Sequence, residues 1–309
     1  MIQYFISRNN QLESIDEMTR GCWIALTEPS LEELISIEEL TGVESNLLRA
    51  ALDRDESPHI DNEDNQVLVI IDAVVISDSE RELYTTIPIG IIQLNDCIIT
   101  ICSNAETFIE DFKGGRVKGF YTQFKTRFLL QVLFRNSTQY LRSLRVIDNM
   151  SSRIERRLSK AQKNEELLEM LRLEKSLVYF STSLRSNQAV LERLFRFDQI
   201  KRYPEDQDLL EDVIVENKQA LDTCDVYVNI IASTMDTYAS IISNNQNDVM
   251  KILTSVSVVI AVPTIISGLY GMNVPIPLGD HPLGFAILIG ITVVLMAILI
   301  YILRKINML

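Results

Sequence analysis

Helix-breaking residues are scarce in the middle of this sequence. No glycine occurs between Gly119 and Gly268, and the prolines in that interval are Pro204 and Pro263 alone. Because glycine and proline are the strongest interrupters of regular structure, their scarcity excludes frequent turns. It predicts very long helices, beginning with two antiparallel ones within 120–203 that break near residues 161–165.

A third long helix is expected to begin at Pro204, with Glu205 or Asp206 as its cap. Nothing interrupts it before residue 262, and from Asp206 onward it counts 57 residues. At 1.5 Å per residue that is roughly 85 Å of helix, which is more than a membrane requires. We therefore expect this helix to be longer than a membrane-crossing segment and to continue into the uncharged apolar stretch at its C-terminal end.

Residues that carry catalysis are also sparse. The chain has two histidines, His59 and His281, far apart in the sequence, and no Gly-rich phosphate loop. No Ser-His-Asp or Cys-His arrangement is suggested. We expect neither an enzyme nor an organic cofactor. The four cysteines form no C-x-x-C pair, and no N-terminal signal peptide is recognised, so we expect reduced, structural thiols in a cytosolic compartment.

Charge is distributed in blocks. Residues 1–120 hold 23 acidic and 8 basic residues, 121–203 hold 8 and 17, and 204–250 hold 10 acidic residues and one lysine. The net charge of −13 excludes nucleic acid as a general partner, because phosphate binding needs a dominant basic surface. The basic block from Arg153 to Lys175 leaves two interpretations, an RNA contact or a solvated helix face.

Two uncharged apolar stretches lie near the C-terminus, Ile252–Tyr270 and Pro282–Leu303. Each has about the 20 residues that cross a hydrocarbon core, although a buried hairpin of a soluble protein is the alternative. Lys251 precedes the first stretch, and Arg304 and Lys305 follow the second. The positive-inside rule therefore places both ends of the pair in the cytoplasm.

The third long helix carries two apolar rows with a seven-residue spacing, as in coiled coils. They pack either on the preceding helices of the same chain or against identical helices of other copies, and the pattern alone does not decide. The first row is Ile214, Leu221, Val228, Met235, Ile242 and Val249, and the second is Leu210, Asn217, Cys224, Ile231, Tyr238, Asn245 and Ile252.

The first 115 residues predict an α+β fold, a mixed sheet flanked by helices. Ile- and Val-rich runs typical of strands alternate with helical segments, and Ser30-Leu-Glu-Glu33 has the form of a capping box. Asn95-Asp96 is a hairpin turn between two of the runs. The expected strands are 2–6, 23–26, 66–76, 84–94 and 97–102, and a second helix is expected over 44–53.

One face of the first apolar stretch is small or weakly polar toward its outer end. It is either a helix-packing seam or the lining of a narrow pore. As a pore, its neutral oxygens would suit a hydrated hard cation such as Mg²⁺, which gives up water reluctantly. Its residues, spaced by three or four, are Asn247, Met250, Leu253, Ser257, Ala261, Thr264 and Gly268.

Tyr270-Gly271-Met272-Asn273, between the two apolar stretches, resembles the signature of the CorA magnesium transporters. Asn247-Asp-Val-Met-Lys251 at the start of the first stretch and Pro263 within it add to the resemblance. The resemblance implies a funnel-shaped homopentamer with a cytoplasmic α/β domain, a long stalk helix and a pore formed by the first span. It also implies that Gly271, Met272 and Asn273 receive the hydrated ion, and that Met250 and Leu253 form a narrow gate.

The same resemblance implies that cytoplasmic Mg²⁺ is sensed between subunits, loosely matching Glu211 and Asp212 with Asp78 or Asp72. Each of these residues is otherwise a solvated carboxylate. The sequence departs from many relatives in the outer loop, where Val274-Pro-Ile-Pro-Leu278 replaces an acidic Met-Pro-Glu-Leu, and at Ala261, where a bulkier residue is familiar. These departures leave the transported ion open, with Co²⁺, Ni²⁺ or Zn²⁺ as alternatives to Mg²⁺, and a zinc-transporting relative is the nearest rival. A separate alternative is a two-span signalling or scaffold protein without a pore.

The expected organisation follows from these observations. The partners are other copies of the chain, the lipid bilayer and divalent cations. The expected segments are a cytoplasmic α/β domain (1–119), a helical hairpin (120–203), a stalk helix (204–250), a pore-lining span (251–270), an outer loop (271–281), a second span (282–303) and a basic cytoplasmic tail (304–309).

Overall fold

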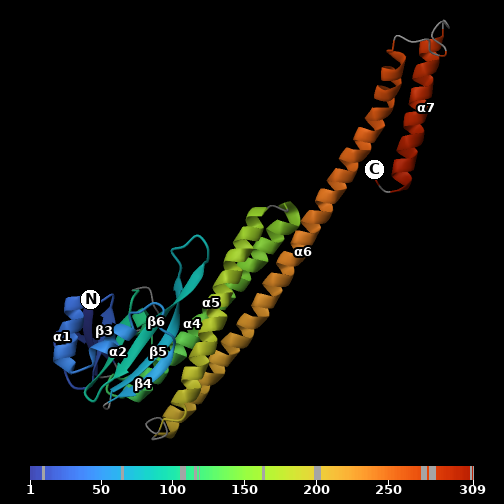
Figure 1. Ribbon diagram of the computed structural model, residues 1–309. Coiled ribbons are helices and arrows are strands. Elements are labelled where there is room, and N and C mark those ends of the chain that lie inside the picture. Colours follow the sequence, from blue (N-terminus) through green and yellow to red (C-terminus); the bar gives the residue numbers. More distant parts are fainter. Residues whose placement is uncertain are drawn as a thin grey trace. The chain divides into compact units, whose positions relative to one another are not determined.

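The computed structural model describes residues 1–8, 11–63, 66–104, 109–114, 117, 119–161, 164–197, 203–272, 277, 283–306 and 308. The chain divides into two compact units, Met1–Met235 and Asp236–Leu309. The first unit holds a sheet and several helices, and the second holds two apolar helical segments (Figure 1). The helix α6, Pro204–Tyr270, belongs to both units.

Seven strands form one mixed sheet in the order β2-β1-β3-β7-β6-β5-β4. All neighbouring pairs are antiparallel except β3 and β7, which are parallel. The predicted mixed sheet is thus confirmed. The strands are β1 (Ile2–Arg8), β2 (Gln11–Ile15), β3 (Cys22–Thr27), β4 (His59–Glu63), β5 (Gln66–Ile76), β6 (Tyr84–Gln93) and β7 (Cys97–Cys102).

The central strands are apolar runs because both faces of the sheet are covered. Every residue of β3 and β7 is buried. The two edge strands, β2 and β4, were not predicted. Their sequences, QLESI and HIDNE, are mostly polar and carry no apolar run, so pairing with β1 and β5 rather than intrinsic preference makes them strands.

Short helices cover one face of the sheet. The capping box predicted at Ser30 is present at the start of α1 (Leu31–Thr41), with Ser30 and Glu33 bonding reciprocally. Helix α2 spans Ser45–Ala50, so the expected helix over 44–53 was too long. The chain leaves the helix in tight turns there, and Ala51 packs closely against Gly90 of β6. A third short helix, α3 (Ile109–Lys113), lies on the opposite face, where Phe112 packs against Trp23, and it was not predicted.

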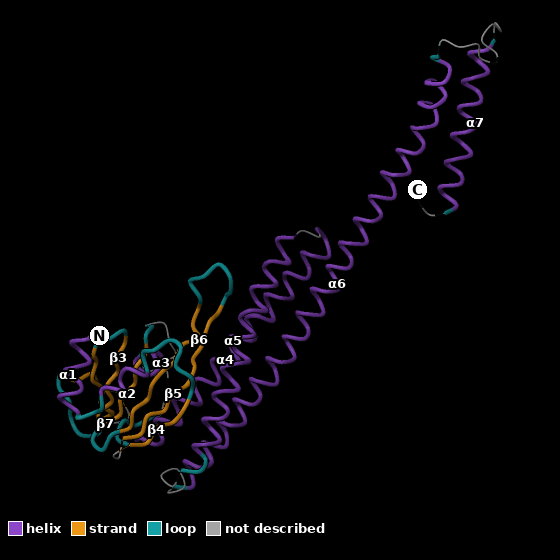
Figure 2. The backbone as a smooth tube through the Cα atoms, in the orientation of Figure 1, coloured by secondary structure: helices purple, strands orange, loops and turns teal. Residues whose placement is uncertain are grey.

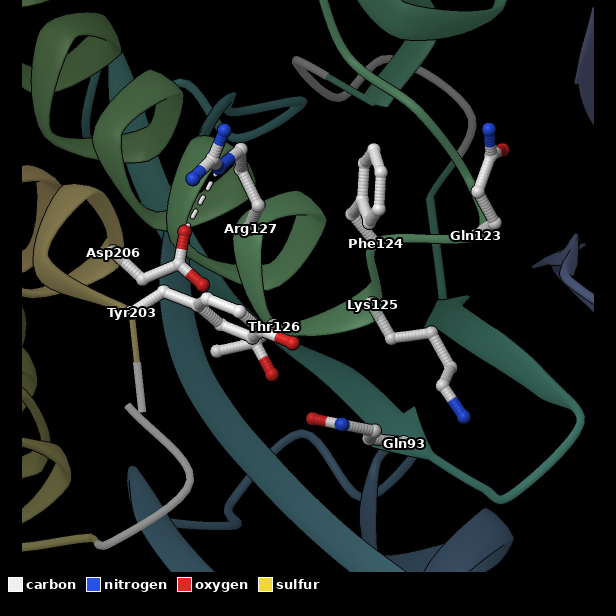
Figure 3. A pocket seen from close by; sticks show the side chains of 8 residues that line it. All are labelled: Gln93, Gln123, Phe124, Lys125, Thr126, Arg127, Tyr203 and Asp206. Atoms are coloured by element: carbon white, nitrogen blue, oxygen red, sulfur yellow. Dashed lines mark hydrogen bonds and ion pairs between the residues drawn. The ribbon is translucent and has the colours of Figure 1, made fainter. Parts of the chain in front are cut away.

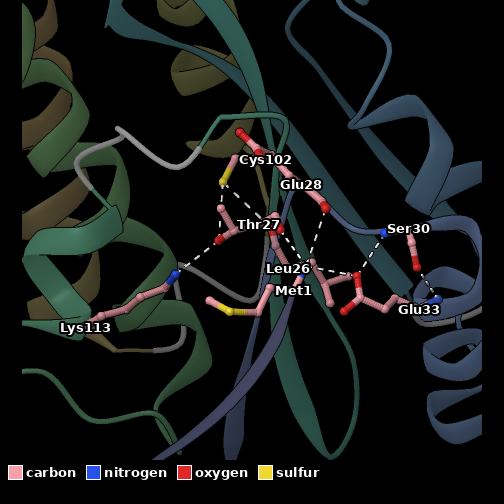
Figure 4. A network of polar contacts seen from close by, with 8 residues as sticks. All are labelled: Met1, Leu26, Thr27, Glu28, Ser30, Glu33, Cys102 and Lys113. Atoms are coloured by element: carbon pink, nitrogen blue, oxygen red, sulfur yellow. Dashed lines mark hydrogen bonds and ion pairs between the residues drawn. The ribbon is translucent and has the colours of Figure 1, made fainter.

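A polar network at the chain start joins three elements (Figure 4). The amino group of Met1 donates to the carbonyl of Thr27 at 2.8 Å and to a carboxylate oxygen of Glu33 at 2.9 Å. The hydrogen bond from the amino group, followed by the one from the Ser30 N–H, lowers the pKa of Glu33. Lys113 of α3 donates to the Thr27 hydroxyl at 3.1 Å, which fastens α3 to the end of β3.

The long helices form as the scarcity of glycine and proline predicted. Helix α4 spans Lys125–Ala161 and α5 spans Asn164–Leu194, with the break where it was expected. Helix α6 continues through Pro263 to Tyr270 (Figure 2). The predicted cap of α6 was wrong, because Pro204 is itself the first helical residue and Asp206 lies within the first turn.

The structure also decides how the second apolar row of α6 packs. Leu210, Asn217, Cys224 and Ile231 are each at most 1% exposed within the single chain. The Asn217 amide donates to the Leu184 carbonyl of α5 at 3.1 Å. This row therefore packs on the preceding helices as far as Ile231, which leaves other faces of α6 for other partners.

Candidate ion pathway and regulatory carboxylates

Among the described residues, α6 and α7 (Gly284–Lys305) are long and apolar enough to cross a membrane. Only 6% of the apolar window of each helix is buried. The core helix of a soluble protein would be mostly buried, so these apolar surfaces need another covering. The predicted boundaries of the two spans stay a prediction.

Helix α7 packs on one side of the apolar part of α6. On α6, Ser255 is fully buried and Val259, Val262 and Ile266 are half-buried. On α7 the covered residues recur every three or four positions, which makes a single stripe. They are Gly284, Leu288, Thr292, Met296, Leu299, Ile300 and Leu303.

The predicted pore face lies on the opposite side of α6. With 3.6 residues per turn, the six residues from Met250 to Gly268 point away from the stripe that meets α7, whereas Asn247 lies about 80° around the helix from Ser255. Met250 is 53% exposed and Leu253 58%, and Ala261 is half-buried. The others are exposed within the single chain, namely Asn247, Ser257, Thr264 and Gly268.

The hydroxyl groups on this face are fixed as hydrogen-bond acceptors. Ser257 donates its proton to the Leu253 carbonyl at 2.8 Å, and Thr264 donates to the Ile260 carbonyl at 3.0 Å. A hydroxyl has one proton and two lone pairs, so each oxygen keeps acceptor capacity directed away from the helix backbone. The face therefore offers neutral acceptors rather than charges.

The far end of α6 carries part of the signature. The Gly271 N–H donates to the Ser267 carbonyl at 2.9 Å, and a Cβ added at Gly271 would lie only 3.2 Å from that oxygen. The Tyr270 hydroxyl donates to the Pro277 carbonyl at 3.3 Å, and Met272 is 54% exposed. Asn273 lies outside the described residues.

Asp72, a predicted regulatory residue, is a centre of hydrogen bonds between β5 and two helices. Its carbonyl accepts from Asn136 at 2.8 Å and Tyr140 at 3.2 Å, both on α4, and from Asn187 on α5 at 2.9 Å. Its N–H donates to the Asn187 amide oxygen at 2.9 Å. Asn136, Tyr140 and Asn187 are all buried.

The sheet itself explains why side chains meet this backbone. Strand β4 begins at His59, which pairs with Ile70, so no neighbouring residue of β4 lies beside Asp72. The Asn187 amide bonds both the N–H and the C=O of Asp72, as a neighbouring strand would. Buried backbone groups need such partners, so Asn187 fastens α5 to the sheet edge.

The carboxylate of Asp72 is half-buried and accepts from the Ser183 hydroxyl at 2.7 Å. Burial raises the pKa of Asp72, and the hydrogen bond from Ser183 opposes that rise. By contrast, Asp78, Glu211 and Asp212 are exposed, and Glu211 accepts a hydrogen bond from Gln207 at 3.3 Å.

The described part of one chain contains no group of three or more His, Cys, Asp or Glu residues placed to hold a metal ion. The four predicted carboxylates are thus not brought together as a finished site within one chain. A site shared between copies stays a prediction.

A hollow of about 350 Å³ lies where α4 and α6 begin (Figure 3). Its two basic side chains already have partners in the same chain. Arg127 pairs with the buried Asp206 at 2.8 Å, and Lys125 donates to the carbonyls of Leu94 and Asn95. The ion pair between Arg127 of α4 and Asp206 of α6 therefore holds the starts of these two helices together. It is lined by Gln93, Gln123, Phe124, Lys125, Thr126, Arg127, Tyr203 and Asp206.

Comparison with known proteins agrees with this architecture. A family model described as CorA-like Mg²⁺ transporter protein matches residues 19–305. The chain belongs to this family. The cobalt/magnesium transport protein CorA of Methanocaldococcus jannaschii is 31% identical over 296 residues, which cover 93% of this chain and 90% of the relative. The CorA protein of Thermotoga maritima is 22% identical over 256 residues, which cover 81% of this chain and 72% of the relative.

The fold is shared over the whole chain. The complete structure of the CorA magnesium transporter from Methanocaldococcus jannaschii superposes with a TM-score of 0.85 at 28% identity, covering 99% of this chain and 98% of that one. Family membership and the two apolar helices together place the chain in a membrane.

Proposed function

We propose that this chain carries divalent cations, Mg²⁺ first, across the membrane through a pore that several copies build together. The observation that carries the proposal is the face of α6 opposite α7, which is exposed in the single chain and bears neutral oxygen acceptors. The names of the relatives, which transport magnesium and cobalt, support the same class of ion.

A hydrated cation explains why acceptors suit this face. The waters around Mg²⁺ point their oxygens at the ion, so its outer surface presents O–H donors only. The amide oxygen of Asn247 and the hydroxyl oxygens of Ser257 and Thr264 accept from such donors without stripping the ion. A carboxylate cage would hold the ion too tightly for passage.

The apolar residues Met250 and Leu253 form the gate in this proposal. They lie between Asn247 and Ser257 on the same face and are 53% and 58% exposed. An apolar constriction closes by excluding water, since a hydrated ion finds no acceptor there. Opening then needs a small rotation or separation of the α6 helices.

Assembly follows from geometry. One chain supplies one pore helix, and one helix cannot enclose a path. Geometry asks for several copies, and the number five is what the resemblance to the CorA magnesium transporters implies. We propose a homopentamer, with the large N-terminal part and both termini in the cytoplasm, as the basic flanks of the spans indicate. Native mass spectrometry in mild detergent is expected to find five copies, and a spectrum of monomers alone would defeat the pore.

Cytoplasmic Mg²⁺ is both cargo and regulator in this proposal. Residues 204–250 hold ten acidic residues and one lysine, so neighbouring copies of this segment repel one another. Divalent ions between copies relieve the repulsion only when the copies are close, which favours the closed arrangement. When internal Mg²⁺ falls, the ions leave, and α6 carries the resulting movement to Met250 and Leu253.

Neutralising Glu211 and Asp212 together, as Glu211→Gln with Asp212→Asn, is expected to raise the Mg²⁺ concentration for half-inhibition by about five-fold or more. The variant should also be less well protected from protease by Mg²⁺. The matched control removes two other exposed acids of α6, Asp222→Asn with Asp236→Asn, and should stay near the parent. Parental Mg²⁺ sensitivity in both assays would move the sensor elsewhere, with Asp72 and Asp78 next.

The transported ion distinguishes a magnesium transporter that also carries Co²⁺ or Ni²⁺ from a zinc transporter. The loop that follows Asn273 holds Asp280 as its single acid, and Ala261 leaves the pore wide at its height. Both features favour tolerance toward Co²⁺ or Ni²⁺ besides Mg²⁺. Flux that ran with Zn²⁺ and not with Mg²⁺ would instead make the chain a zinc transporter.

A further inference from the structure

The end of the chain folds back onto α6. The Ser255 hydroxyl donates to the carbonyl of Met308 at 2.9 Å, across 53 positions of sequence. The Met308 N–H in turn donates to the carbonyl of Leu303 at 3.0 Å. Ser255 is 0% exposed and Met308 is half-buried, so the contact is largely shielded. We call the Ser255–Met308 contact the tail clasp.

The tail clasp differs from the other serine and threonine contacts described in the two apolar helices. The hydroxyls of Ser257, Thr264 and Ser267 donate to carbonyls of α6, and that of Thr292 donates to a carbonyl of α7. Those bonds stay whatever the helices do. The Ser255 bond joins two separate segments, so it lasts only while they keep one relative placement.

The position of the tail clasp matters for the gate. Ser255 lies on the side of α6 that meets α7, across the helix axis from Leu253 and Ser257. Met308 lines the same surface hollow as Asn247, Met250 and Thr254. The clasp therefore reaches the flank of α6 beside Asn247 and Met250, at the height of the proposed gate.

We propose that Ser255 is a positioning residue for the gate. By holding the Met308 carbonyl, it fixes the rotation of α6 about its own axis, which decides whether Met250 and Leu253 face the path. Successive residues of a helix lie about 100° apart, so a rotation of roughly half that angle already turns Met250 and Leu253 away from the path. This inference rests on the proposed pore and assigns a task to a residue outside its lining.

Removing the hydroxyl with Ser255→Ala is expected to make the closed pore leak. In proteoliposomes with millimolar Mg²⁺ on the side of the N-terminal unit, residual flux should rise about three- to ten-fold, the range that one net hydrogen bond spans. Maximal flux without that Mg²⁺ should change less than about two-fold, since the lining is intact. Ser255→Thr keeps a hydroxyl and should restore closure.

Two further variants separate positioning from general damage. Ser267→Ala removes a hydroxyl that bonds only its own helix, and it should leave the closed-state flux at the parental level. Deleting residues 307–309 removes the acceptor instead of the donor and should leak as Ser255→Ala does. Because both changes break one contact, their combination should add nothing, whereas additive effects would overturn the proposal.

Amide hydrogen exchange in the full-length protein tests the clasp without any flux. Ser255→Ala should speed exchange of the Met308 N–H. Without the Ser255 hydroxyl, the Met308 carbonyl is no longer held on α6, so the bond from the Met308 N–H to the Leu303 carbonyl opens more often. If Ser255→Ala exchanged faster but the parent protein carried no ion flux, the clasp would be supported and the proposed pore would be rejected. Unchanged exchange, or faster exchange with parental closed-state flux in an active protein, would overturn the positioning role.

Discussion

Replacing Asn273 by alanine is expected to reduce Mg²⁺ uptake to the level of empty liposomes while the assembled protein stays in the membrane. In the proposed pathway this amide stands at the entrance, directly after Gly271 and Met272, and accepts hydrogen bonds from the waters of the arriving ion. Alanine offers no acceptor there, and one such group is lost from every copy. Uptake of Mg²⁺ into proteoliposomes measures the effect.

A matched asparagine variant controls for the substitution itself. Asn149 lies exposed on α4, and its amide donates to the Arg145 carbonyl of the same helix at 2.8 Å. Asn149→Ala should transport as the parent does. Near-normal uptake by Asn273→Ala, in protein that still assembles, would remove Asn273 from the mechanism.

The largest expected loss of stability comes from Gly90→Ala in β6. A Cβ at Gly90 would lie 2.3 Å from the Cβ of Ala51 and 3.5 Å from its Cα. Ala51 and β6 are both buried, so neither moves freely, and overpacking of this kind costs about 1–3 kcal/mol or more. Thermal or urea unfolding of the detergent-solubilised chain should show a clearly lower midpoint.

A second substitution tests the cause. Ala51→Gly removes the opposing methyl group, so the double variant with Gly90→Ala should regain most of the lost stability. Ala51→Gly alone should cost only about 0.5–1 kcal/mol, through backbone entropy. If the double variant were as unstable as the sum of the two single variants, the contact between these two positions would not be the cause.

The sequence predicted those elements whose local signals agree with their surroundings. The lack of glycine and proline located the three long helices, and the Ile- and Val-rich runs located the buried strands. The capping box at Ser30 formed because donor, acceptor and spacing all lie within one helical turn. Such features need no knowledge of distant residues.

Features that depend on distant partners were missed. Strands β2 and β4 exist through pairing, and helix α2 ends early where Ala51 meets Gly90. Pro204 took the place assigned to a capping carboxylate, while Asp206 bonds Arg127, 79 positions earlier.

The candidate site divides in the same way. Helical spacing alone predicted that Asn247, Met250, Leu253 and the rest of the pore face share one side of α6, because that is local geometry. The same pattern does not show that α7 covers the opposite side, or that Ser255 reaches Met308. A serine inside an apolar stretch, off the predicted pore face, was the available signal.

Asp72 has a second part in the fold that the sequence did not reveal. The resemblance suggested metal sensing by its carboxyl group, which stays a prediction, and the structure shows that its backbone fastens α4 and α5 to the sheet. Sequence alone does not reveal that β4 begins too late to cover this backbone. Asn187, which takes the place of the missing strand, therefore went unnoticed.

The most direct measurement is Mg²⁺ flux into liposomes that contain the purified full-length chain and an internal Mg²⁺-sensitive dye. An inward Mg²⁺ gradient and an inside-negative potential, with no nucleotide, should produce a rise in internal Mg²⁺ that Asn273→Ala lacks. A passive pore needs no further energy source. Parent liposomes that stay as tight to Mg²⁺, Co²⁺, Ni²⁺ and Zn²⁺ as protein-free ones, although the protein is folded and assembled, would contradict the pore and favour a membrane-anchored scaffold.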